Sequence, residues 1–120
     1  MITEDYCSYE VAKLLKEKGF EGICDYAYSN KGNYFEIDRS NFDEVYCLRP
    51  TLQMAMKWLR EVHYIHANPI KQGNYNDCSD YYTWIVARMG YIHRNPTVAE
   101  KLSYEEAVEA ALKYSLENLI

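Results

Sequence analysis

Apolar residues between positions 49 and 64 recur every three or four residues, which predicts a helix over about 52–63. Thr51 is the expected N-cap, because its hydroxyl can accept a hydrogen bond from an amide of the first turn. Only a narrow polar stripe remains, so we expect the helix to be covered on several sides, with Trp58 buried at the centre of the core. The expected apolar stripe consists of Leu52, Ala55, Met56, Leu59 and Val62.

The segment over about 8–18 carries signals for both ends of a second helix. Ser8 precedes the first apolar residues as the expected N-cap, and Gly19 follows the last turn, where a left-handed residue commonly ends a helix. If Gly19 adopts that conformation, Phe20 packs against Leu15, the apolar contact that accompanies such an ending. The sequence therefore predicts a helix that stops at Gly19.

A third helix is predicted over about 103–118 from its capping residues. Ser103 and Glu106 can each accept a hydrogen bond from the other's backbone amide, which is the capping-box arrangement. Small and aliphatic residues follow on one face, which predicts burial, and charged residues follow on the other. The expected solvated stripe consists of Glu106, Glu109, Lys113 and Glu117.

The remaining segments alternate with a period of two, which indicates β-strands. The pattern over about 24–37 predicts a hairpin, because the turn formers at 29–32 separate two alternating runs. A strand is predicted over about 65–69, where Pro69 either confines the strand to an edge or ends it. The strand predicted over about 81–89 is largely apolar on both faces.

These elements predict an α+β fold in which three helices pack on a small antiparallel sheet of four to five strands. The chain of 120 residues is expected to form a single domain over 1–120, because this length can bury a core without metals or disulfides. The four cysteines show no CxxC spacing, so we expect reduced thiols.

The charge balance disfavours one class of partner. There are 18 acidic and 13 basic residues, giving a formal charge of −5, and the basic residues are scattered among the acids. Such a chain neutralises phosphates poorly, so nucleic acid is not an expected partner. No apolar run reaches the roughly 18 residues of a membrane helix, so we expect a cytoplasmic protein with no membrane partner.

Candidate metal ligands are few. The sequence contains no HExxH motif and no cysteine pair that would complete a tetrahedral zinc site. We therefore expect histidines in structural hydrogen bonds, with no cofactor and no catalytic residue identified. The candidate soft ligands are His63, His66, His93 and Cys78.

Carboxylates support an alternative function. Asp25, Glu36 and Asp38 in the hairpin, or the acids at 77–80, could hold a divalent cation in a small metal-dependent, nuclease-like enzyme. The same positions need polar residues to solvate turns and hairpin ends. Convergence of these acids with a histidine in one concave pocket would favour the enzyme.

Thirteen tyrosines are the most unusual feature of the composition. Tyrosine combines an apolar ring with a polar tip, so it suits half-buried sheet faces as well as protein contacts. Together with the absence of a catalytic motif, this surplus favours a non-enzymatic interaction module. The expected contact residues are Tyr26, Tyr28, Tyr34, Tyr81 and Tyr82.

The apolar strand beginning at Tyr81 also bears on assembly. Three helices can leave part of a sheet uncovered, and a symmetric homodimer would hide that surface. The alternative is a monomer in which helices from both chain ends cover the sheet. The sequence favours the dimer, with apolar residues on both faces of the strand as the reason.

Three stretches taken together carry a family resemblance: YCSYEVAKLLKEKGF, PTLQMAMKWLREVH and SYEEAVEAALKYSLENLI. The chain resembles a family of short uncharacterised proteins from phages and prophages of anaerobic gut bacteria. The resemblance covers both ends and the centre, and it brings no catalytic or cofactor-binding positions with it. It implies a phage-derived accessory protein that binds a protein partner of host or phage origin.

Overall fold

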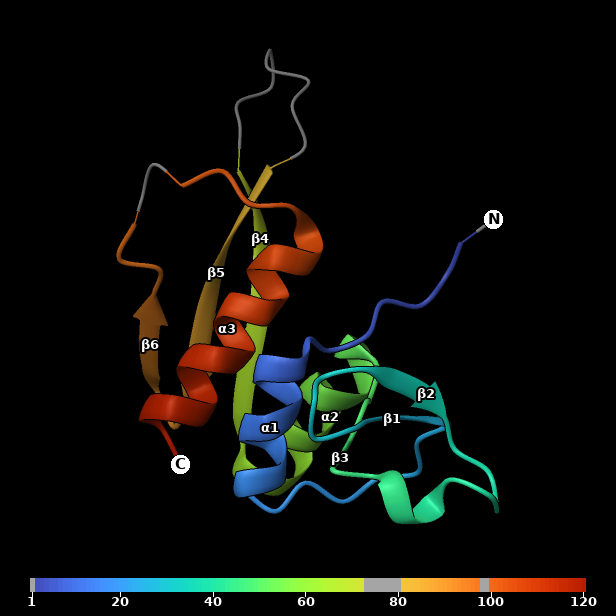
Figure 1. The fold of residues 1–120 in the computed structure, drawn as a ribbon. Coiled ribbons are helices and arrows are strands. Elements are labelled where there is room, and N and C mark those ends of the chain that lie inside the picture. Colours follow the sequence, from blue (N-terminus) through green and yellow to red (C-terminus); the bar gives the residue numbers. More distant parts are fainter. Residues whose placement is uncertain (1, 73–80, 98–99) are drawn as a thin grey trace.

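The computed structural model describes residues 2–72, 81–97 and 100–120. This part of the chain forms three α-helices and six strands, together with one short 3-10 helix (Figure 1). In chain order the elements are α1 (Tyr9–Glu17), β1 (Tyr26–Tyr28), β2 (Tyr34–Glu36), η1 (Phe42–Glu44), β3 (Cys47–Leu48), α2 (Leu52–His63), β4 (Ile65–Gln72), β5 (Tyr81–Arg88), β6 (Tyr91–Arg94) and α3 (Tyr104–Asn118).

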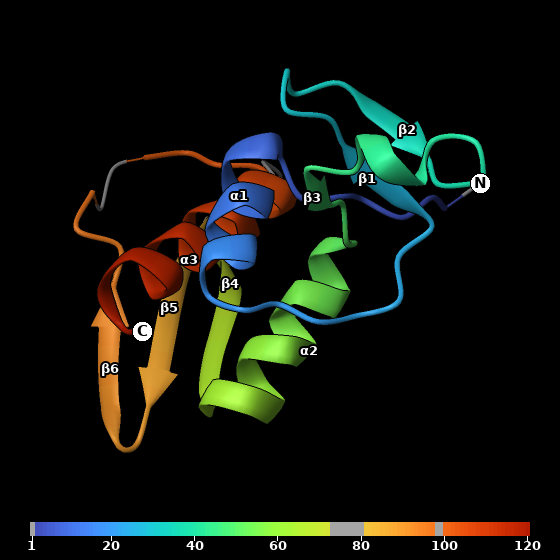
Figure 2. The same ribbon diagram turned by 60° about the horizontal axis from the view of Figure 1, so that its bottom comes forward.

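The α+β class and the three helices agree with the sequence prediction, but the single sheet of four to five strands does not. Two separate antiparallel sheets of three strands form, in the orders β2-β1-β3 and β4-β5-β6. Residues Cys47–Leu48 of β3 take the free edge of the hairpin at β1, so the hairpin never reaches the larger sheet. Helices α1 and α2 lie between the two sheets (Figure 2). The larger sheet is built from β4, β5 and β6 alone.

Helix α3 packs across one face of the larger sheet, and α2 packs against its edge strand β4. Pro69 lies within β4 and has no N–H to donate, which suits the edge position that the sequence predicted. The strand continues past Pro69 as far as Gln72.

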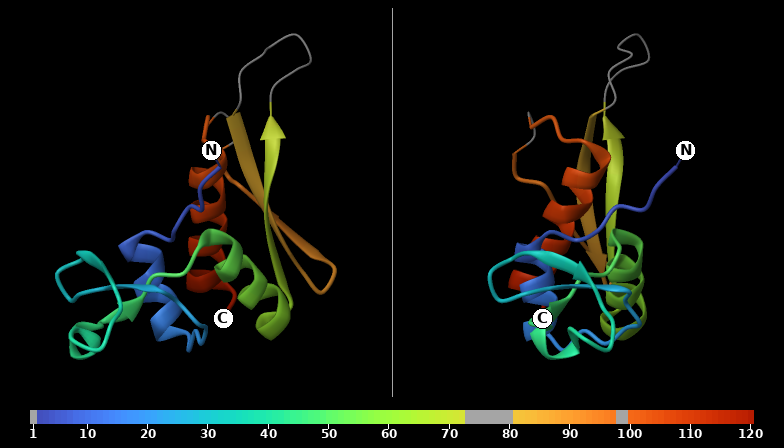
Figure 3. Two further views of the ribbon diagram at one scale, coloured as in Figure 1. Left: turned by 90° about the vertical axis from the view of Figure 1, so that its right-hand side faces the viewer. Right: turned by 45° about the vertical axis from the view of Figure 1, so that its right-hand side comes forward.

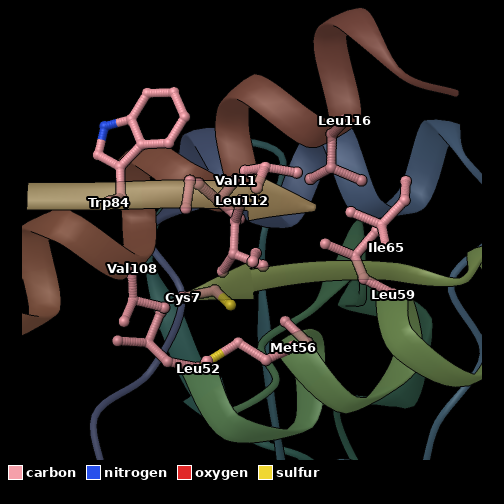
Figure 4. Packing of buried hydrophobic residues seen from close by; sticks show 14 of the residues in the cluster. Cys7, Val11, Leu52, Met56, Leu59, Ile65, Trp84, Val108, Leu112 and Leu116 are labelled. Carbon is pink, nitrogen blue, oxygen red and sulfur yellow. The ribbon is translucent and has the colours of Figure 1, made fainter. Parts of the chain in front are cut away.

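The main core joins α1, α2, β4, β5 and α3, whose side chains point toward one another (Figure 4). Trp58 is buried with 9% of its surface exposed, and its ring centroid lies 5.6 Å from that of Phe20. Leu59 and Leu112 are fully buried and lie deeper than Trp58. Val62, which the helical spacing placed on the buried stripe, is 52% exposed and does not belong to this core.

Both predicted ends of α1 are confirmed. The Ser8 hydroxyl accepts a hydrogen bond from the amide of Val11, as an N-cap does. Gly19 has a φ of +83°, and the amide of Phe20 donates to the carbonyl of Leu15 at 2.9 Å. This is the hydrogen-bond pattern of a Schellman ending. Local chemistry therefore sets both ends of the helix.

One residue of the predicted solvated stripe is in a different place. Glu109 of α3 is half-buried and accepts hydrogen bonds from the Ser8 amide at 2.6 Å and the Ser8 hydroxyl at 3.0 Å. The carboxylate thus sits at the N-terminus of α1, where a helix has free amides and a partial positive charge. Packing of α1 on α3 partly covers Glu109, and spacing along α3 does not reveal this long-range contact.

The capping box of α3 is present as predicted. The Ser103 hydroxyl accepts from the Glu106 amide at 3.1 Å, and the Glu106 carboxylate accepts from the Ser103 amide at 3.0 Å. We expect Ser103→Ala to lower the free energy of unfolding by about 1 kcal/mol, because a first-turn amide loses its acceptor. Urea denaturation followed by circular dichroism measures this, with Ser103→Thr as the control that keeps a hydroxyl. An unchanged midpoint for the alanine variant would contradict the role of the cap.

Candidate functional site

The histidines proposed as metal ligands do not come together. His63, in the last turn of α2, packs its ring edge-on against Trp58 at 4.8 Å between centroids. His66 is exposed on one face of the larger sheet, whereas His93 lies on the other face with its Nδ1 3.0 Å from the Tyr114 hydroxyl. Cys78, the fourth candidate, lies outside the described residues. The sheet itself separates His66 from His93.

The hairpin carboxylates are exposed and lie in turns and strand ends. Asp38 accepts hydrogen bonds from the Ser40 hydroxyl and amide and from the Asn41 amide, and these bonds lower the pKa of the Asp38 carboxyl. Asp25 and Glu36 are exposed as well. Within residues 2–72, 81–97 and 100–120, no three His, Cys, Asp or Glu side chains are grouped so that they could hold a metal ion. The acids at 77–80 lie outside the described residues.

The cysteines of the described chain are free thiols. Cys7 and Cys47 are buried, and Cys24 is half-buried. Burial raises the pKa of each of these thiols, most strongly at Cys7. They are therefore protonated at neutral pH, and a protonated buried thiol is a poor nucleophile.

The five tyrosines expected to make contacts have different surroundings. Tyr28 is buried, so its ring is not available to a partner, and Tyr26 is half-buried beside it. Tyr34 is 61% exposed. On β5, Tyr82 faces α3 and meets the Tyr104 ring edge-on at 5.5 Å between centroids, while the neighbouring Tyr81 faces the opposite side of the sheet.

That opposite side of the larger sheet is not covered by the described helices and carries several apolar side chains. All three described helices lie on one side of the sheet, and the other side is open (Figure 3, left). Because strand residues alternate between faces, the strand register identifies the side chains on the open face. Cross-strand neighbours there are His66, Ala87 and Ile92 in one row, Asn68, Ile85 and Arg94 in the next, and Ile70 with Thr83 in the third.

At the β5–β6 end this open face is hollowed. A concavity of about 630 Å³ lies against the row of His66, Ala87 and Ile92 and is closed by the hairpin turn. Its rim carries large exposed side chains. No acidic residue is found among the described residues that line it, which are Tyr64, His66, Ala87, Arg88, Met89, Gly90, Tyr91 and Ile92.

Two lining residues have an unusual backbone conformation. Tyr64 ends α2 with a φ of +58°, and Met89 opens the β5–β6 turn with a φ of +48°. These are the non-glycine residues with positive φ in the described chain. The left-handed conformation costs a non-glycine residue about 1–2 kcal/mol. Both side chains are nevertheless large and exposed, Tyr64 at 70% and Met89 at 82%.

Strained backbone conformations are found at functional sites more often than elsewhere. Because both strained residues line the hollow, the hollow is the candidate functional site. Sequence reasoning missed Tyr64, Met89, Tyr91 and Ile92 as a group. The pair Met89-Gly90 between two strands could have indicated the strained turn. A two-residue hairpin turn of type I′ needs positive φ at both positions. Methionine at the first position departs from the usual asparagine or aspartate.

Arg88 also lines the hollow, but its guanidinium points away from the hollow toward the end of α3. Its guanidinium donates to the carbonyl of Leu119 at 2.6 Å, at the C-terminus of α3. A cation suits that end of a helix, where carbonyl groups are unpaired. The hollow therefore offers a largely apolar surface, and its chemistry suits contact with apolar side chains.

Comparison with known proteins adds nothing to this geometry. No protein-family model, curated protein or solved structure matches this chain. The resemblance to phage proteins therefore stays a prediction. Among the described residues, no helix is both long enough and apolar enough to cross a membrane.

Replacement of Met89 by asparagine is expected to stabilise the fold by about 0.5–1 kcal/mol, because asparagine tolerates the left-handed conformation and Asn-Gly is a preferred pair in such turns. Chemical denaturation measures the gain. Met89→Leu is the matched control, since it keeps both the backbone strain and the apolar surface and should leave the stability unchanged. Equal stability of the asparagine variant and the wild type would show that the turn is not strained.

Proposed function

We propose that this protein is a non-enzymatic interaction module whose contact surface is the open face of the β4-β5-β6 sheet. The observation that carries the proposal is the hollow at the β5–β6 end, where two strained residues expose large apolar side chains. Clustered exposed apolar side chains mark interaction sites in soluble proteins. Alternation within the sheet adds Ile70, Ile85 and Ile92 to the same surface.

We further propose that the partner on this face is a second copy of the chain. The face carries apolar and neutral side chains with Arg94 as its arginine, so two copies can stack without opposing acids, although each chain carries a net charge of −5. Edge-to-edge pairing through β4 is hindered by Pro69, which cannot donate to a neighbouring strand. We therefore favour stacking of two open faces over pairing through the β4 edge.

The size of the surface predicts a weak dimer. Strands β4 and β5 have eight residues and are about 26 Å long, whereas β6 has four residues; at about 4.8 Å between strands the three give a flat area of about 310 Å². That flat area is less than half of the ~800 Å² that each partner buries in a standard interface. Side chains at the hairpin end, such as Met89, must supply the remainder.

Light scattering over a range of concentrations tests this proposal. We expect the mass to rise from the monomer value of 14.2 kDa toward twice that value as the protein is concentrated. Ile92→Asp, on the short strand β6, should abolish the rise by placing a charge in the interface. Phe42→Asp is the matched control, because Phe42 is also apolar and more than half exposed but lies in η1.

Two outcomes would contradict self-association through the open face. A mass that stays at the monomer value at every concentration would reject self-association through this face. Loss of association in Phe42→Asp to the same degree as in Ile92→Asp would place the contact elsewhere on the molecule.

A further inference from the structure

Arg49, directly after β3, lies among four tyrosine rings at the smaller sheet. The carbon of its guanidinium is 4.0 Å from the ring centroid of Tyr34 and 4.3 Å from that of Tyr6. Tyr28 and Tyr26 follow at 5.7 and 5.9 Å. These distances are within the range of cation–π attraction.

The sheet register explains why the cluster forms. The Arg49 amide donates to the Tyr26 carbonyl at 2.9 Å, so Arg49 extends the pairing of β3 with β1. Tyr26 and Tyr28 are two residues apart and share a face of β1, and Tyr34 lies opposite Tyr28 on β2. The Arg49 side chain therefore reaches across β1 to the ring of Tyr34.

The orientation of the guanidinium is held by a hydrogen-bond chain. Arg49 Nε donates to the Tyr28 hydroxyl at 3.2 Å, and that hydroxyl donates to the Cys7 carbonyl at 2.6 Å. Since Tyr28 is buried, this chain is anchored within the fold. The two nearest rings hold the guanidinium in place, so little conformational entropy is left to lose on binding a ligand.

The two terminal nitrogens of this group have no acceptor among the described residues. Arg49 is half-buried, yet no carboxylate of the described chain lies within 4.0 Å of it, and its Nε bond to Tyr28 is its side-chain hydrogen bond. The chain carries 18 acidic residues against 13 basic ones, so acids are plentiful. The terminal nitrogens of Arg49 are not among the buried polar atoms that lack a partner, so they are accessible to an anion from outside the described chain.

We propose that Arg49 is a binding site for the carboxylate group of a ligand. The terminal N–H groups of a guanidinium form a planar fork that matches the two oxygens of a carboxylate. A phosphate could satisfy the same fork, but its second negative charge is disfavoured here. Glu36 lies two residues from Tyr34 on the same face of β2, and the chain as a whole is negative. The exposed ring of Tyr34 offers an apolar surface beside the carboxylate.

NMR titration tests the site with simple probes. Sodium acetate is added at constant ionic strength, balanced with sodium chloride, while the Nε–H signal of Arg49 and the ring signals of Tyr6 and Tyr34 are followed. We expect saturable shifts with a dissociation constant of the order of 1 mM, which is appropriate for one small anion. Arg49→Lys keeps the charge but removes the planar fork, and it should weaken binding at least tenfold.

Two further variants guard against an effect on folding. Tyr34→Leu changes an exposed ring and should weaken acetate binding several-fold without unfolding the protein. Arg39→Lys is the matched control, because Arg39 is exposed and contacts no aromatic ring of the described residues, so acetate binding should be unchanged.

Three outcomes would overturn the assignment. Non-saturating shifts, or equal shifts with chloride alone, would show general screening instead of a site. Tighter saturable binding of inorganic phosphate than of acetate at the same ionic strength would reject a carboxylate as the ligand. Unaltered acetate binding in both Arg49→Lys and Tyr34→Leu would place the anion elsewhere.

Discussion

Replacement of Trp58 by alanine is expected to lower the free energy of unfolding by about 3–5 kcal/mol, the range for deleting a large buried aromatic side chain. Trp58 is 9% exposed, and its ring packs edge-on against both Phe20 and His63. The substitution removes these contacts and leaves a cavity between α2 and the segment that follows α1. A domain of this size is stable by only about 5–15 kcal/mol, so the loss is a large part of the total.

Urea denaturation followed by circular dichroism measures this effect. The fluorescence of Trp84, which remains in the variant, gives a second signal. Val62→Ala is the matched control on the same helix. Val62 is half exposed, so its truncation should cost less than about 0.5 kcal/mol. A loss below about 1 kcal/mol for Trp58→Ala would show that α2 is not central to the core.

Removal of the Glu109 carboxylate is expected to cost about 1–2 kcal/mol in Glu109→Ala, because two charge-assisted hydrogen bonds to Ser8 are lost. The same change removes the hydrogen bonds that link α3 to the N-terminus of α1. The control is the nearby ion pair of Lys113 and Glu10, which are 2.7 Å apart and well exposed. Exposed pairs contribute little, so Glu10→Gln should have no measurable effect on stability. Equal effects of the two substitutions would contradict a special role for Glu109.

The pH dependence of stability gives a second test of Glu109. Burial raises the pKa of its carboxyl above the usual 4.5, Glu10 adds to that rise, and the hydrogen bonds from Ser8 oppose it. The folded state therefore retains the proton to a higher pH than the unfolded state does. Stability contributed by the neutral carboxyl is present below the unfolded pKa and is lost as the pH rises through the folded pKa.

Glu109→Gln removes this titration while keeping an acceptor for Ser8. We expect the glutamine variant to gain stability relative to the wild type as the pH is raised from 4 to 7, and the gain to end once the carboxyl is ionised in both states. Parallel stability curves for the two proteins over this range would show that the pKa of Glu109 is not raised.

Elements whose determinants are local could be predicted from the sequence. Ser8, Gly19 and Ser103 set helix ends through hydrogen bonds to residues three or four positions away, so their neighbours in the sequence contain the necessary information. Pro69 likewise limits its strand to an edge, because the missing N–H is a property of the residue itself.

The partners of strands and the surroundings of side chains could not be predicted in this way. Period-two alternation marks the hairpin as strands, but it does not show that β3 occupies the hairpin edge and leaves two separate sheets. Glu109 has the same spacing whether it meets water or the N-terminus of α1, and Arg49 gives no local sign of the four rings around it. These positions depend on contacts between residues far apart in the chain, whose free energy is decided only when the whole core packs.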